Sequence, residues 1–191
     1  MTLAHLILAA ELASLFFSRA YGSSSSFPEN NPELGAYQNE GKCFPLQDTY
    51  YIMYRNYKED PLFGGEAKCI IIAETGPFVD GSGTFQVQYG GNNTVNVKAT
   101  LLSSPGYSVQ NVIQIQSIDV PQIIFNITSV YTDCRRCKVF RHSYIENGLG
   151  CTLWKTEASL NEDLACCEFV YDLVCGTSRK YQVYDNCKEK I

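Results

Sequence analysis

The chain has 191 residues, a formal net charge of −5 from 15 basic and 20 acidic residues, and nine cysteines. This acidic balance argues against nucleic acid or an anionic membrane as the main partner, because both attract basic proteins. The cysteine count indicates an oxidising compartment, in which disulfides persist.

An apolar run from Leu3 to Phe17 opens the chain and is followed by small residues up to Gly22. The run is too short to span a bilayer as a helix, and it predicts a secretory signal peptide over residues 1–22, cleaved near Ala20 or Gly22. The alternative is a buried N-terminal helix. We therefore expect a soluble protein that is secreted into the extracellular space.

Residues 23–35 are rich in Ser, Pro and Asn and offer little to bury, which predicts a flexible leader. The remaining residues, 36–191, show no internal repeat and no further linker. Their number suits one domain that is long enough to bury its own core.

Between residues 50 and 157, short runs alternate apolar and polar side chains, as strands with one dry face do. Phe85, Val87 and Tyr89, for example, alternate with two glutamines. Turn residues rich in Gly, Pro and Asn separate the runs. The predicted strands are 50–57, 67–74, 83–90, 93–103, 109–117, 121–131, 135–143 and 149–157.

One helix is predicted after these strands, from Ser159 to Gly176. Ser159 and Glu162 fit a capping box, in which each side chain bonds the backbone N–H of the other. Gly176 fits the left-handed residue that often ends a helix. One apolar stripe at helical spacing is formed by Leu160, Leu164, Cys167, Tyr171 and Val174.

A single helix cannot cover eight half-buried strands, so the sheet must cover itself. Closure into a barrel hides the dry faces and removes the exposed edges. We therefore predict an all-β fold, an eight-stranded up-and-down antiparallel barrel with a C-terminal α-helix packed outside. Its interior would be filled by side chains or hold one small ligand. The competing architecture is a two-sheet sandwich.

Two groups of short motifs follow the predicted strands. The first group lies at the first strand and the loop after it: Tyr54-Arg55-Asn56-Tyr57, Asp60-Pro61-Leu62-Phe63-Gly64-Gly65 and Lys68-Cys69. The second group lies in the C-terminal half: Tyr131-Thr132-Asp133, Cys137-Lys138-Val139, Cys151-Thr152-Leu153-Trp154, Cys166-Cys167 and Tyr184-Asp185-Asn186-Cys187. In order and spacing these motifs resemble the tick salivary lipocalins, the group that includes the histamine-binding proteins.

The resemblance implies a lipocalin domain over residues 36–191 that binds and sequesters a small host inflammatory mediator and so suppresses host defence, without catalysis and without a cofactor. In the amine-binding members two carboxylates stand where this chain has Lys138 and Thr152. A buried ammonium group without an anion costs several kcal/mol. Two ligand classes therefore compete. The family favours a biogenic amine such as histamine or serotonin, whereas the missing acids favour an eicosanoid-type lipid with a carboxylate.

The resemblance also implies disulfide bonds. Cys43 is expected to pair with Cys166 or Cys167, Cys69 with Cys187, and Cys137 with the helix or with Cys151, while the pairing of Cys151 and Cys175 stays open. Cys134 is an addition to the family pattern. Because nine cysteines cannot all pair within one molecule, Cys134 is the expected odd residue. A monomer is expected, with a dimer linked through Cys134 as the alternative.

Aromatic side chains on the strands can line a ligand cavity or fill a core. The candidate ligand-binding residues are Tyr54, Glu74, Phe85, Tyr89 and Trp154. A core role competes for the two residues of the third strand, and a structural role at the end of the barrel competes for the tryptophan. Glu74 and Asp119 are candidate anions for an amine, although both also fit solvated acids at strand ends.

Three cations, Lys98, Lys138 and Arg141, could face a lipid carboxylate, although exposed strand positions are the simpler expectation for them. His142 is likewise expected on the surface of a strand. Since the other histidine, His5, lies in the expected signal peptide, no metal cluster and no Cys-His dyad is predicted.

Two sequons predict glycosylation at Asn92 and Asn126. A second class of function also remains open at this point. In it the barrel is a scaffold whose outer surface binds a host protein, such as a complement component or a protease.

Overall fold

The structure is a computed structural model that describes residues 27–177 and 179–187. The expected signal peptide, residues 1–22, and positions 23–26 of the expected leader lie outside this part of the chain. Among the described residues, no helix is both long enough and apolar enough to cross a bilayer.

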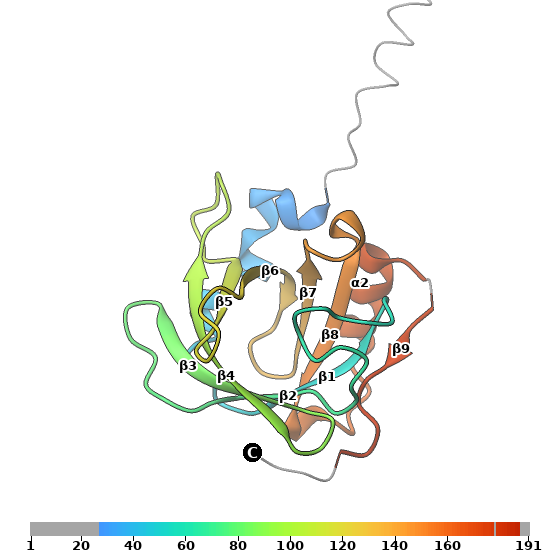
Figure 1. Ribbon diagram of the computed structural model, residues 1–191. Helices are drawn as coiled ribbons and strands as arrows, with labels where there is room; N and C mark the ends of the chain where they lie inside the picture. The colour runs from blue at the N-terminus through green and yellow to red at the C-terminus, as the bar shows by residue number, and fades with distance from the viewer. Residues whose placement is uncertain (1–26, 178, 188–191) are drawn as a thin grey trace, which may run out of the picture.

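The predicted strands form one closed antiparallel barrel (Figure 1). Neighbouring strands follow in chain order from β2 to β8, β1 pairs with β8, and the pairing of β1 with β2 closes the ring. The barrel prediction is confirmed, and the sandwich is excluded because all strands belong to one sheet. The strands are β1 (Tyr50–Arg55), β2 (Ile71–Glu74), β3 (Ser82–Tyr89), β4 (Asn93–Leu102), β5 (Val112–Ser117), β6 (Ile124–Thr132), β7 (Cys137–His142), β8 (Gly150–Thr156) and a short β9 (Tyr181–Gln182) that was not predicted.

The barrel buries side chains on both of its faces. In β1, Tyr50 and Ile52 point into the interior, whereas Tyr51 and Met53 belong to a second apolar cluster outside. This outer cluster lies under the helix α2 (Ala165–Cys175), which packs against β7 and β8. Every residue of β7 and β8 is therefore buried.

The helix begins six residues later than predicted. Ser159 ends a short 3-10 turn, η5 (Glu157–Ser159), and the capping box does not form, since Glu162 N–H donates to the backbone oxygen of Ser159. The turn is held against the start of β1, where Glu157 N–H donates to Thr49 O. Tertiary contacts therefore override the local capping signal, whereas Gly176, at φ +81°, ends the helix as predicted.

Residues 28–35 do not behave as the predicted flexible leader. They form the 3-10 turns η1 (Pro28–Asn30) and the start of η2 (Pro32–Tyr37), followed by η3 (Glu40–Lys42), and η1 and η2 contact β6. Glu29 is buried at 2% exposure. The segment is anchored by buried polar side chains, which an apolar pattern does not reveal.

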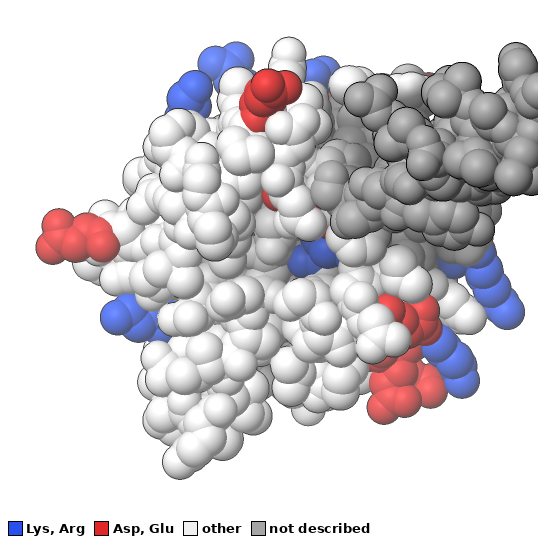
Figure 2. Space-filling model, turned by 90° about the horizontal axis from the view of Figure 1, so that it is seen from above, with Lys and Arg blue, Asp and Glu red and all other residues white. Residues whose placement is uncertain are grey.

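The N-terminal turns lie above one end of the barrel in Figure 1, and Figure 2 views the molecule from that side. The middle of this face is formed mainly by uncharged residues, with basic and acidic side chains around its periphery. The described part of this face carries no continuous basic surface, in keeping with the net charge. A further 3-10 turn, η4 (Glu146–Gly148), joins β7 to β8.

Four disulfides staple the fold, Cys43–Cys134, Cys69–Cys187, Cys137–Cys167 and Cys151–Cys175. The second is the pair that the resemblance implied, and the third joins Cys137 to the helix. Two expectations were wrong. Cys43 pairs with Cys134, in the turn between β6 and β7, and not with Cys166 or Cys167, and Cys134 is therefore not the odd cysteine through which a dimer could be linked. Cys166, expected in a disulfide, is instead the free and exposed cysteine. Adjacent helical residues point about 100° apart, so only Cys167 faces the barrel.

Candidate ligand-binding site

The barrel contains two adjacent spaces of different size. A mouth pocket of about 450 Å³ lies where the loop after β1 meets the ends of β3 to β6. A deep chamber of about 40 Å³ lies further in, toward the end covered by the N-terminal turns. Phe63, Val87 and Val97 line both spaces. The large free volume is therefore at the mouth, and the deep end is mostly filled by side chains.

Phe63 separates the mouth pocket from the deep chamber. Its ring stacks on Trp154, with centroids 6.2 Å apart, and meets Phe125 edge-on at 6.0 Å. The loop that carries it is fixed by Asp60, whose Oδ1 accepts the N–H of Phe63 at 2.9 Å. Gly64 follows at φ +89°, a conformation that favours glycine. The loop sequence thus places an aromatic ring inside the barrel.

A chain of hydrogen bonds runs beside Phe63 through buried polar side chains. Trp154 Nε1–H donates to Thr152 Oγ1 at 2.7 Å, and this hydroxyl lies 2.8 Å from His142 Nε2. The other ring nitrogen, Nδ1, lies 3.0 Å from Tyr144 Oη, which donates to Asp60. Since the indole can only donate and the carboxylate can only accept, Thr152 donates to a neutral His142 that carries its proton on Nδ1. Each polar group in the chain is satisfied.

His142 is buried at 1% exposure, so the prediction of a surface histidine was wrong. Burial lowers the pKa of His142 to about 4, and the charges of Arg55 and Arg141 act in the same direction, although Asp60 opposes them. The imidazole is therefore neutral near pH 7. It acts as a structural link between Tyr144 and Thr152.

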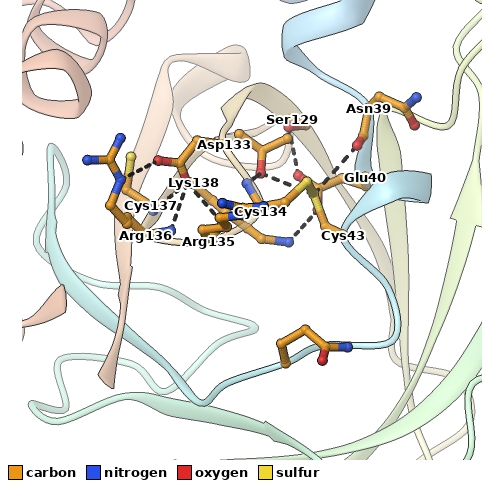
Figure 3. The surroundings of a disulfide bond; sticks show 12 residues. Asn39, Glu40, Cys43, Ser129, Asp133, Cys134, Arg135, Arg136, Cys137 and Lys138 are labelled. Carbon is orange, nitrogen blue, oxygen red and sulfur yellow. Dashed lines mark hydrogen bonds and ion pairs between the residues drawn. A yellow bond between two sulfur atoms is a disulfide. The ribbon is translucent and has the colours of Figure 1, made fainter. Parts of the chain in front are cut away.

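Lys138 projects into the deep chamber, so its expected exposure was also wrong. Its Nζ lies 2.5 Å from Glu40 Oε2, and Glu40 Oε1 accepts from Ser129 Oγ at 2.9 Å (Figure 3). The ammonium also lies 4.9 Å from the ring centroids of Phe44 and Tyr50. Because Glu40 neutralises it, Lys138 carries no spare charge into the chamber.

The Cys43–Cys134 disulfide holds this ion pair in place. It lies beside Glu40, between η3 and the turn that precedes Lys138 (Figure 3). In the same turn, Asp133 Oδ1 accepts the backbone N–H groups of Arg135, Arg136 and Cys137. The closed end of the barrel is thus tied by a covalent bond and by charge-assisted hydrogen bonds.

Arg141 was expected to be exposed and is also buried, but on the outer side of the barrel. Its Nε lies 2.5 Å from Glu29 Oε1, and its Nη2 donates to Val174 O near the end of α2 at 2.7 Å. A cation at this position satisfies a carbonyl that the helix leaves unpaired. Lys98, in contrast, is exposed as expected.

The structure brings together three of the five candidate ligand-binding residues. Phe85 and Trp154 line the deep chamber, and Tyr89 lines the mouth pocket. Tyr54 lies outside the barrel, under α2, where it donates to Glu168. Glu74 lines neither space, and its Oε2 accepts Leu46 N–H at 2.6 Å.

Sequence reasoning missed the central role of Phe63 and the contribution of Phe125. The available signal for Phe63 was the Asp60–Gly65 motif, in which two glycines follow an aromatic residue. Phe125 lies on an alternating strand and differs in no way from a core residue at the level of sequence. Loop residues that fold into a barrel escape a search for periodicity, since they belong to no strand.

The mouth pocket is apolar apart from a few groups. Among the described residues Asp119 is its one charged lining residue, and Asp119 is exposed. The hairpin between β5 and β6 also presents Ile118 and Val120 to solvent, at 47% and 46% exposure. The pocket and its rim are apolar, and its edge at Asp119 is exposed to water. Such a site suits a ligand with an apolar body and a polar end.

Comparisons with known proteins agree with this geometry. A sequence model of the family described as tick histamine binding protein matches residues 28–189. The solved structure of AM182 in complex with serotonin has a TM-score of 0.54 and 17% identity, and the match covers 83% of this chain and 88% of that one. For japanin from Rhipicephalus appendiculatus bound to cholesterol, the TM-score is 0.50, the identity 12%, and the coverage 73% and 95%.

The solved structure of apocrustacyanin C1 has a TM-score of 0.53 and 10% identity, over 83% of this chain and 88% of that one. Among curated proteins, no sequence matches this chain significantly. At such low identities the similar structures show the fold, and the chemistry of the pocket must come from this chain.

Proposed function

Because the chain belongs to the tick histamine-binding protein family, we propose that it is a secreted lipocalin that sequesters a small host inflammatory mediator, and that this mediator is an amphipathic lipid. The main observation in favour of a lipid is the mouth pocket of about 450 Å³. Among the described residues, its single charged lining residue is the exposed Asp119. Burying the apolar body of a lipid there stabilises the complex by roughly 25 cal/mol per Å².

The competing ligand is a biogenic amine, which the family favours. A buried ammonium group needs a carboxylate that is free to pair with it. Asp60 accepts hydrogen bonds from Tyr57, Tyr144 and two backbone N–H groups, so its oxygens are occupied. Glu40 is likewise bound to Lys138 and Ser129. The buried acids of the described interior are therefore already used, which supports the lipid.

The AM182 and japanin structures do not decide between the two ligand classes. AM182 is in complex with serotonin and japanin is bound to cholesterol, so this fold accommodates both kinds of molecule. In this chain we place the apolar body of the ligand against Phe63 and Val97. Its polar end lies at the open side of the mouth pocket, beside the exposed hairpin between β5 and β6, where water remains accessible.

Binding alone accounts for the proposed activity. His142 is neutral near pH 7 and both of its nitrogens are engaged, so it is not placed to take a proton from a bound molecule. A protein of this kind acts stoichiometrically, by lowering the free concentration of the mediator.

Secretion and glycosylation belong to the same proposal. Four disulfides support an oxidising compartment. Asn92, in the turn between β3 and β4, and Asn126, on β6, are both exposed. Neither asparagine lines the mouth pocket or the deep chamber.

Calorimetric titration of the secreted protein with a leukotriene, arachidonate, histamine and serotonin tests the proposal. We expect binding of a lipid and no submicromolar binding of the amines. Val120→Asn should weaken lipid binding about fivefold, since about 1 kcal/mol of apolar contact at the mouth is lost.

Ile118→Asn is the matched control, because Ile118 lies in the same hairpin with similar exposure and does not line the pocket. Submicromolar histamine binding without lipid binding would overturn the lipid proposal. If none of the four molecules binds, the outer surface of the barrel, and hence a host protein, becomes the better candidate.

A further inference from the structure

A third concave site, separate from the two interior spaces, lies outside the barrel between the loop after β1 and the segment around β9. This cleft has a volume of about 260 Å³. Its charged lining residues are Arg55, Lys58, Glu66, Lys68, Arg179 and Lys180, and we call it the basic cleft. One third of the chain's 15 basic residues meet here beside a single acid, although the whole protein has a net charge of −5. The basic cleft shares no lining residue with the mouth pocket or the deep chamber.

The two walls of the basic cleft are tied to each other. Tyr54 and Arg55 pair with β9, and Cys69 N–H donates to Val183 O at 3.0 Å. The Cys69–Cys187 disulfide adds a covalent link between the same two segments. The cations are therefore held on a preformed surface, which lowers the entropy lost when a ligand binds.

Two of the exposed cations lack an acidic partner. Among the described residues, no carboxylate lies within 4.0 Å of Lys68 or Arg179. Lys68 Nζ donates to Gln182 O, and the Arg179 guanidinium lies 4.9 Å from the ring centroid of Tyr181. Both cations are thus positioned by neutral groups and keep their full charge for a ligand.

The other two surface cations are only partly available. Lys180 pairs with Asp172 at 2.7 Å and with Glu168 at 3.5 Å. Lys58 pairs with Glu66 at 3.3 Å, but both side chains are more than half exposed, and such pairs contribute little. Glu66 can therefore move away when an anion enters.

Arg55 supplies a buried positive charge beneath this surface. Its side chain is 3% exposed, and its Nη2 donates to Lys58 O at 2.8 Å and to Gly65 O at 2.7 Å. Its Nε and Nη1 have no hydrogen-bond partner, and no described carboxylate forms an ion pair with it. The guanidinium carbon lies 5.3 Å from the ring centroid of Tyr57. A desolvated guanidinium with no direct ion pair is costly, and its field is weakly screened.

We propose that the basic cleft binds the phosphate or sulfate ester group of a soluble host molecule. A multiply charged oxyanion is attracted by the buried charge of Arg55, which has no ion-pair partner among the described residues, and accepts hydrogen bonds from Lys68 and Arg179. The planar fork of arginine matches such oxyanions in particular. The volume accommodates one such group with a sugar or nucleoside attached. Glu168 and Asp172, on the adjacent helix α2, disfavour an extended anionic surface.

Titration at low ionic strength with a nucleoside diphosphate and with a sulfated disaccharide tests the proposal and distinguishes the two sources of the anion. We expect at least one of them to bind, and to bind more weakly as salt is added. The double variant Lys68→Gln/Arg179→Gln should weaken this binding about tenfold, since two charge-assisted hydrogen bonds are lost.

The matched control is Lys42→Gln/Lys98→Gln, which changes the net charge equally but removes exposed cations that do not line the basic cleft. We expect its affinity to stay within about twofold of the unmodified protein. The proposed site is refuted if neither probe binds, or if both double variants lose the same amount of affinity. Lipid binding in the same samples is independent of this result, so failure here and failure of the proposed function are distinguishable.

Discussion

At the scale of single residues, the main finding is that charged and polar side chains of β7 are buried. Lys138, Arg141 and His142 were all expected at the surface. The alternation of side chains along a strand predicts which residues share a face of the sheet, but it does not predict which other segments cover that face. The inner face of β7 meets Glu40 at the closed end, and its outer face meets Glu29 and α2. The two buried charges of β7, Lys138 and Arg141, are each matched by a partner more than 90 residues away in sequence.

The buried His142 predicts a pH dependence of stability. Its folded-state pKa of about 4 lies below the ordinary histidine value of 6.5, so the unfolded state binds more protons between these values. The free energy of unfolding should therefore fall as the pH drops from about 7 toward 4. The contribution of this residue is about 3 kcal/mol.

Urea unfolding at a series of pH values measures this loss. In His142→Gln the loss between pH 7 and pH 4 should be smaller by about that amount, because glutamine does not titrate. Equal pH dependence in the two proteins would contradict the assignment of a buried, neutral histidine.

At the scale of elements, the sequence predicted all eight barrel strands to within a few residues, because alternation and turn chemistry are local. It misplaced the start of α2, because the turn before the helix is held by contacts with the start of β1. Two disulfides, Cys137–Cys167 and Cys151–Cys175, then fix the helix to the barrel. Cys166 stays free and exposed, with Tyr131 Oη of β6 3.9 Å from its sulfur.

The adjacent cysteines of α2 should respond differently to substitution. Thiol labelling of the native protein should modify Cys166 alone, and Cys166→Ser should change the free energy of unfolding by less than about 0.5 kcal/mol. Cys167→Ser should lower it by about 2–4 kcal/mol, because the disulfide to Cys137 is lost. Peptide mapping by mass spectrometry that found Cys166 bonded within the molecule would refute this connectivity.

At the scale of the whole molecule, closure of the sheet creates the binding space, and one loop decides how it is divided. The loop after β1 folds back into the barrel and inserts Phe63 between the mouth pocket and the deep chamber. The same loop forms one wall of the basic cleft with Lys58 and Lys68. Neither arrangement can be seen in the chain order, since each depends on segments that meet only after the barrel closes.

Removing the dividing ring should join the two interior spaces. Phe63→Ala should lower the free energy of unfolding by about 3 kcal/mol, because a buried aromatic side chain is lost. It should also strengthen the binding of a longer-tailed lipid about tenfold, since about two more methylene groups become buried.

Fluorescence of Trp154, which loses its stacking partner, and calorimetric titration report the two effects. Phe169→Ala is the control, because Phe169 is 65% exposed on the outer face of α2. An unchanged lipid affinity in Phe63→Ala would mean that the ligand does not pass this ring.

The sequence by itself determined the all-β barrel and the helix outside it, because strand alternation and turn residues are local features of the chain. The family resemblance, which rests on the order and spacing of short motifs, implied the Cys69–Cys187 pair. Only the tertiary structure decided which charges are neutralised, where the free volume lies and which cations gather at β9. These properties depend on which distant loops meet at the ends of the barrel and on how much water their contacts exclude.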